Sequence, residues 1–267
     1  MNENIKWIAG AVAVVGLSIG AVLYLTHKEK VEEPKQEVAL PPPMAAEEPP
    51  IEHPMPEAET REPLAPLAES DAPMRNALAE LIGKDSVEQF LVPDEVIRHI
   101  VVTVDNLPDV KVAERIRPVK KTPGAFAVGG TEESPVLDET NYQRYAGFVK
   151  LLQTVDTAEL VTTYTRFYPR FQEVYENLGH PPQYFNDRLV QVIDHLLATP
   201  DVQGPITLAR PGVLYEYADK SLELRSAGQK LLIRMGPENA AAVKAKLREL
   251  REAIVAQSAA AKQTPTG

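Results

Sequence analysis

The feature that most restricts the fold of this chain is an uncharged apolar run near the amino terminus. Nineteen consecutive residues, from Trp7 to Leu25, carry no charge, and lysines stand outside both ends of the run. At about 1.5 Å per residue, a helix of this length covers about 28 Å, close to the ~30 Å hydrocarbon core of a bilayer. Trp7 and Tyr24 lie at the two ends, where interfacial aromatic rings are favoured. The pattern predicts one transmembrane helix at about residues 7–25, in contact with the lipid bilayer.

The competing interpretation of this run is a cleaved signal peptide. A signal peptide has an apolar core of only 7–15 residues and a small-residue cleavage site, whereas this run is longer and ends in Tyr-Leu-Thr-His-Lys. A retained membrane anchor over residues 1–30 is therefore favoured. Gly16 and Gly20 have the G-x-x-x-G spacing that can pair membrane helices, so a homodimer stays open. Three glycines scattered in an Ala/Val-rich span are the simpler interpretation.

A proline-rich acidic segment follows at residues 31–73. It holds 11 of the 24 prolines, and eleven acidic residues against two basic ones, which account for nearly all of the net charge of −10. Each proline fixes φ and removes a backbone donor, and like charges extend the chain. The segment is predicted to be a disordered linker. The remaining part is close to neutral, and this excludes the strongly basic surface expected of a nucleic-acid-binding protein.

Residues 74–257 are predicted to form one mostly α domain, α+β at most, with one short β-hairpin, and residues 258–267 a disordered tail. Apolar residues recur at helical spacing between Pro and Gly stops. Pro169 is expected to kink or split one of the helices, and Asn186 to cap another. The expected helices are 74–82, 93–107, one from 140, 157–178, 186–197, 221–235 and one from 237 to about 257, with a strand at 125–128 and a hairpin of 206–209 with 213–217.

Common catalytic and cofactor motifs are absent from the sequence. It contains no phosphate-binding G-x-x-x-x-G-K-[ST], no G-x-G-x-x-G, no G-x-S-x-G and no H-E-x-x-H, and it has no cysteine. No cofactor and no metal site are therefore expected, and an enzyme is the less favoured class.

One carboxylate and histidine cluster is nevertheless a weak catalytic candidate. Asp187 and Asp194 share the polar face of the helix expected from Asn186, and His195 lies beside them. A His next to a carboxylate can perform acid/base chemistry near neutral pH. The solvated face of an amphipathic helix is the simpler interpretation.

Candidate binding residues come from two regions. Tyr164, Tyr168 and Tyr175 lie on one helix and could line a groove for a peptide or glycan, although core packing also accounts for such aromatic residues. Arg188, Lys230 and Arg234 could face an anionic partner, and exposed basic residues without a partner are the alternative.

Short strings spread over about residues 80–255 carry a resemblance to one family. They are VDNLP at 104–108, NY at 141–142, RY at 144–145, FNDRL at 185–189, VID at 192–194, LATP at 197–200, AGQK at 227–230 and RMG at 234–236. With these strings the sequence looks like a proteobacterial family classified as a domain of unknown function, number 3014, whose members also have an amino-terminal anchor and a Pro-rich stretch. The resemblance implies a bacterial inner membrane protein and transfers no activity or site residue.

The leading hypothesis is a membrane-anchored binding or scaffolding protein of the bacterial cell envelope. A long tether is useful when a module must reach an envelope protein or a cell-wall glycan, and catalysis does not require one. The domain is placed in the periplasm, although the lysines at 28–35 lean slightly towards a cytoplasmic location. The alternative is an envelope hydrolase or metal-dependent enzyme that uses Asp187, Asp194 and His195.

Overall fold

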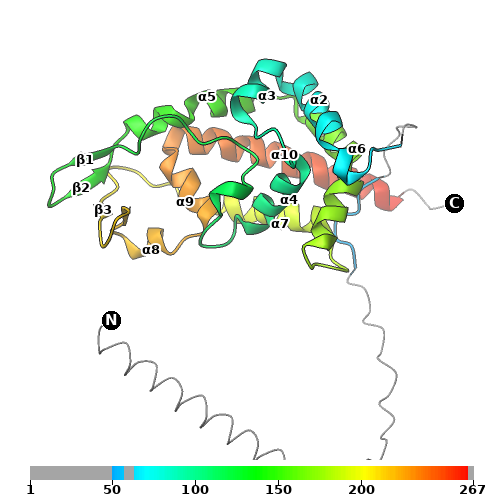
Figure 1. The fold of residues 1–267 in the computed structure, drawn as a ribbon. Helices are drawn as coiled ribbons and strands as arrows, with labels where there is room; N and C mark the ends of the chain where they lie inside the picture. Colours follow the sequence, from blue (N-terminus) through cyan, green and yellow to red (C-terminus); the bar gives the residue numbers. More distant parts are fainter. Residues whose placement is uncertain (1–49, 57–62, 264–267) are drawn as a thin grey trace, which may run out of the picture. The chain divides into compact units, whose positions relative to one another are not determined.

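The computed structural model of the chain describes residues 50–56 and 63–263. The predicted transmembrane helix at 7–25 and most of the predicted linker lie outside these residues. Within the two described ranges, no helix is long and apolar enough to cross a membrane. The described part is mostly helical, as predicted, with nine α-helices and two small antiparallel strand pairs (Figure 1).

The helices and strands follow one another along the described chain with short connections. The helices are α2 (Asp71–Ile82), α3 (Lys84–Phe90), α4 (Val96–Asn106), α5 (Thr140–Thr154), α6 (Thr157–Asn177), α7 (Phe185–Leu197), α8 (Lys220–Glu223), α9 (Ala227–Arg234) and α10 (Pro237–Gln263). The strands are β1 (Val128–Gly130), β2 (Pro135–Leu137), β3 (Leu208–Ala209) and β4 (Glu216–Tyr217), and 3-10 turns cover Leu67–Glu69 and Glu114–Ile116.

The long helix α10 runs through the middle of the helical layer. It packs against α5, α6, α7 and α9, while α4 packs against α6 and α7 (Figure 1). The strand pairs lie at one end of the domain and α6 at the other. This arrangement brings the carboxyl end of α6, the start of α7 and the last turns of α10 to one end of the domain.

The largest apolar cluster joins α2, α4, α6 and α7. Phe167 and Phe171 of α6 are buried in it, as their four-residue spacing predicts, and the ring of Phe171 stacks on Phe185 with centroids 5.8 Å apart. Apolar burial of this kind is the dominant favourable contribution to folding. It holds the start of α7 firmly against α6.

One expected helix is continuous and another is divided. Of the two effects expected of Pro169, a split does not occur: α6 continues through it, because Pro169 lies on the exposed side while Phe167 and Phe171 anchor the helix on both sides of it. The single helix expected at 221–235 is two helices, α8 and α9. Ser226 separates them, because its hydroxyl accepts the N–H of Gln229 and caps α9.

The chain also has elements that the sequence did not predict. Helix α3 was missed, and the strand expected at 125–128 is displaced to β1, which pairs with the unpredicted strand β2. The predicted hairpin is confirmed as β3 and β4, with shorter strands. Helix α10 continues six residues beyond the expected end, and Ser258 in this extension is buried.

Candidate functional site

A short piece of the chain, bent at Glu52 and His53, lies across the start of α7. This docked segment, residues 50–56, falls within the region expected to be linker. Asp187 accepts the backbone N–H of Glu52 at 3.0 Å and that of His53 at 2.6 Å. Residues 52 and 53 form a bend, and the bend directs their successive N–H groups towards the one carboxylate.

Asn186 holds the same segment from the other side. Its amide Nδ2 donates to the carbonyl oxygen of His53 at 2.8 Å, and its Oδ1 accepts the hydroxyl of Tyr164 at 3.0 Å. The prediction that Asn186 caps α7 is wrong, because Tyr184 occupies the cap position and α7 has no side-chain cap there. Asn186 is fully buried, so its amide is fixed in place by these contacts.

The three candidate tyrosines lie behind this contact, on α6. The ring of Tyr175 is buried, and Tyr164 and Tyr168 are half-buried against the same core, so core packing accounts for most of their area. Burial raises the pKa of Tyr164 well above its usual value and that of Tyr168 to about 12. Both hydroxyls therefore stay protonated at physiological pH, and Tyr164 remains a constant donor to Asn186.

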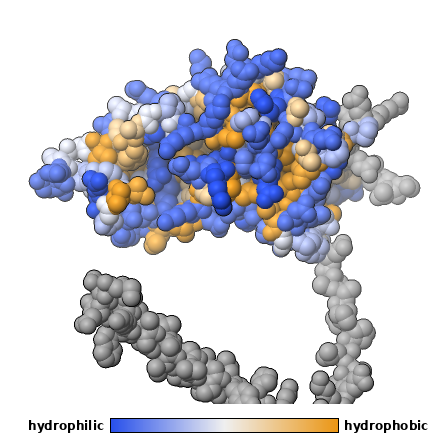
Figure 2. Space-filling model, in the orientation of Figure 1, coloured by the Kyte–Doolittle hydropathy of each residue, from blue (hydrophilic) through white to orange (hydrophobic). Residues whose placement is uncertain are grey.

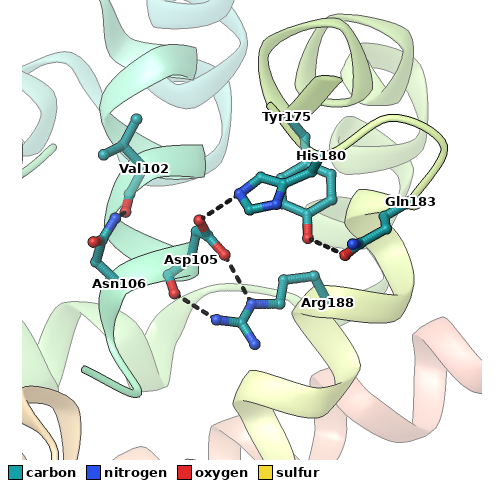
Figure 3. Close-up of polar contacts among 7 residues, drawn as sticks. All are labelled: Val102, Asp105, Asn106, Tyr175, His180, Gln183 and Arg188. Carbon is teal, nitrogen blue, oxygen red and sulfur yellow. Dashed lines mark hydrogen bonds and ion pairs between the residues drawn. The ribbon is translucent and has the colours of Figure 1, made fainter. Parts of the chain in front are cut away.

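An ionic cluster on α4, α7 and the loop between α6 and α7 adjoins the start of α7. In this Asp105 cluster, Asp105 accepts Nε of Arg188 at 2.9 Å, and its other oxygen lies 3.1 Å from Nε2 of His180 (Figure 3). Arg188 also donates to the Asp105 carbonyl at 2.7 Å. The His180 ring stacks on Tyr175 with centroids 4.5 Å apart. These contacts hold Arg188 in one orientation beside Asp187.

A polar pocket of about 280 Å³ opens between the docked segment and α7. It contains both acceptor and donor groups and one fixed guanidinium, so it suits a polar ligand better than an apolar one. Its lining is Pro50, Glu52, Tyr175, Gln183, Tyr184, Asp187, Arg188 and Gln191.

The model of the family described as "Protein of unknown function (DUF3014)" matches residues 96–251. The chain belongs to this family. No curated protein and no solved structure matches it. In this DUF3014 chain the matched region contains the Asp105 cluster, Asn186 and Asp187, while the docked segment lies outside it.

The acid/base candidates of the DUF3014 chain do not share one pocket. Asp187 binds the docked segment, whereas Asp194 forms a bidentate pair with Arg251 of α10 at 2.5 and 3.0 Å. His195 lies 2.9 Å from the hydroxyl of Ser226 at the start of α9. Each therefore has its own structural partner, and the geometry brings no two of them together on a reacting group.

The remaining binding candidates divide between two places. Arg188 lines the pocket, but Lys230 and Arg234 lie on α9. Lys230 is buried and donates to the carboxylate and carbonyl of Glu223, and the guanidinium of Arg234 lies 5.8 Å from the centre of the Tyr217 ring. Both residues stabilise the α8–α9 region rather than the site on α7. Across residues 50–56 and 63–263, no group of three or more His, Asp or Glu side chains is placed to hold a metal ion.

The sequence reasoning missed Asp105, His180 and Gln183 as site residues. Asp105 lies 83 positions before Arg188, and helix periodicity gives no signal for a contact over that distance. The one sequence signal that could have pointed to Asp105 is the string VDNLP at 104–108, which is among the strings that resemble the family. His180 and Gln183 belong to a loop whose course depends on how α6 packs against α7.

Proposed function

We propose that this chain is a membrane-anchored binding protein of the bacterial cell envelope, and that its domain holds the main chain of a bent peptide segment at the start of α7. The observation that carries the proposal is the pair of hydrogen bonds from Glu52 and His53 to Asp187. Successive backbone N–H groups of a bent segment can converge on one anion, and such an arrangement recognises main chain rather than side chains.

The geometry supports binding better than catalysis. Asp187, Asp194 and His195 are each engaged with a different part of the protein, so the hydrolase alternative lacks the convergent groups that it requires. The Asp105 cluster is likewise internally paired, with Arg188 and His180 both bound to one carboxylate. Such paired groups fix a surface in shape, which is what a binding site needs.

The envelope location rests on the sequence. The apolar run at 7–25 supplies the anchor, and the acidic Pro-rich stretch supplies a tether that could hold the domain away from the bilayer in the periplasm. The expected location and the main-chain hydrogen bonds together favour an envelope protein with a bent, proline-containing segment as the partner.

Two measurements on the full chain in its native membrane test the proposal. A carboxyl-terminal reporter that is active in only one compartment should report a periplasmic domain. Gln191 lines the pocket, so a photo-crosslinking side chain at this position should form an adduct with another protein. Leu224 is exposed at the end of α8 and does not line the pocket, so the same group at Leu224 should form no such adduct. Loss of the Gln191 adduct on Asp187→Asn is also expected. Cytoplasmic reporter activity, or equal adducts at both positions, would refute the proposal.

A further inference from the structure

We infer that residues 50–56 are a built-in competitor of the partner peptide: they occupy the binding groove in cis and must leave before a bent, proline-containing segment of another protein can bind. This inference rests on the proposed function. It assigns the occupant of the same site and the way in which access to it is controlled.

The hydrogen bonds to the docked segment are made to its main chain. Asp187 accepts two N–H groups, Asn186 donates to the His53 carbonyl, and Nζ of Lys262 donates to the Glu52 carbonyl at 2.7 Å. The side chains of Ile51 and Glu52 stay exposed. Another bent segment with two successive N–H groups followed by proline could therefore make the same hydrogen bonds, because no side chain of residues 50–56 takes part in these bonds.

The receptor side of the groove has structural contacts of its own, besides those to the segment. Asn186 is fully buried and is oriented by Tyr164, and Arg188 next to Asp187 is held by Asp105. Tyr164 and Tyr168 belong to the apolar core. When the segment leaves, the groove therefore keeps its shape, and its acceptor and donor groups become open to an incoming peptide.

The segment itself is weakly held compared with the core. Its residues are exposed or half-buried, and it contributes no residue to the buried apolar clusters. Segments with few buried apolar contacts have a low free energy of local opening. Pro50 and Glu52 also form one wall of the pocket, so release of the segment would widen it towards Tyr184 and Gln191.

The chain keeps the segment close to the groove. Only six residues separate Pro56 from Pro63, and Arg170 then holds the carbonyls of Leu64 and Ala65. A short connection gives an effective concentration in the millimolar range, so a free peptide of the same chemistry competes poorly. The apparent affinity for a partner is the intrinsic affinity multiplied by the fraction of molecules whose groove is free.

A competition experiment with the full chain in detergent micelles tests the inference. The probe is a fluorescent peptide with the sequence of residues 48–58, blocked at both ends, and binding is followed by fluorescence anisotropy. The variant Glu52→Pro with His53→Pro removes both N–H donors from the cis segment and leaves Asp187, Asn186 and Lys262, which hold the segment, unchanged. We expect this variant to bind the probe at least about tenfold more tightly than the wild-type chain.

Three controls make the result specific. Adding Asp187→Asn to the variant should reduce binding to the wild-type level or below, and a probe carrying the same two proline replacements should not bind. Thermal unfolding followed by circular dichroism shows that the variants fold, and His53→Pro alone provides a milder release if the double variant does not.

Each outcome decides one of the two claims. Equal probe binding by wild-type chain and variant would overturn the built-in competitor and leave the proposed function standing. No binding by either chain would overturn peptide recognition at this site altogether. A wild-type dimer in light scattering that the proline variant loses would show exchange of the segment between two copies, and it would overturn the assignment of a foreign partner.

Discussion

The carboxylate of Asp187 accepts the backbone N–H of His53 at 2.6 Å, although 134 positions separate the two residues. The contact gives Asp187 a different role from the acid/base group that its neighbours on the helix suggest. It also makes a piece of the proline-rich segment part of the folded domain, next to a polar pocket. On the face shown in Figure 2, apolar residues form several separate patches among polar ones, so the domain offers no single continuous apolar surface there.

Asp187→Asn should release residues 52 and 53 from the domain. An amide keeps one acceptor and loses the charge that strengthens both hydrogen bonds, which is worth about 1–2 kcal/mol at this half-buried site. Amide hydrogen exchange at Glu52 and His53 should accelerate about tenfold, since 1.4 kcal/mol corresponds to a factor of ten. Asp194→Asn, which alters the pair with Arg251, is the matched control and should leave both amides unchanged. Unaltered exchange in Asp187→Asn would contradict the docking geometry.

Asp105→Ala should destabilise the domain and loosen the α6–α7 loop. Arg188 and His180 both lose their carboxylate partner, and the side chain of Asp105 is only 16% exposed. Removing such a partner leaves partly buried polar groups without a hydrogen bond, at a cost of about 1–3 kcal/mol. Urea unfolding measures this loss. Glu114→Ala, which breaks a pair with Lys121 in which both side chains are more than two-thirds exposed, should change stability by less than about 0.5 kcal/mol. A similar effect of both variants would argue against the cluster as a structural unit.

Gly236→Ala should be one of the most damaging single-methyl changes in the domain. Gly236 has φ of 83°, and an added Cβ would lie 2.5 Å from the ring of Tyr142. Backbone strain and overpacking add, so a loss of about 2–4 kcal/mol is expected in denaturant unfolding. Gly204→Ala measures the backbone strain alone, because Gly204 has φ of 80° and open space around it. It should cost about 1–2 kcal/mol. Equal losses would show that the Tyr142 ring moves aside.

Glu223→Gln should destabilise the domain at pH 7 and have a smaller effect at pH 3. Burial alone would raise the pKa of Glu223, but the N–H of Tyr217 and the ammonium of Lys230 together lower it. Because the folded-state pKa is lowered, the carboxylate contributes stability above its ordinary pKa of 4.5, and this stability is lost as the pH falls through the lowered value. The loss at pH 7 should be about 1–3 kcal/mol. Thermal unfolding at the two pH values measures it, and an effect that grows on acidification would contradict the assignment.

The local sequence predicted the main helices well where short-range physics decides them. Gly83 ends α2 with a positive φ, and Pro237 begins α10. The regular spacing of Phe167 and Phe171 marked the buried face of α6. The failures share a cause. Asn is a residue type that often caps helices, yet the amide of Asn186 is held by Tyr164 and His53 instead. Pro is a residue type that often breaks helices, yet α6 is not split at Pro169, because the helix is packed on both sides of it.

The sequence by itself determined the mostly helical class, the membership of a family of unknown function and the candidate residues on α7. Only the tertiary structure decided which of those residues meet. Asp187 and Arg188 are adjacent on one helix, but one binds residues 52–53 and the other binds Asp105. Helix periodicity depends on interactions three or four residues apart, whereas these partners are 83 and 134 positions away and meet because α4, α6 and α7 bury a common apolar core.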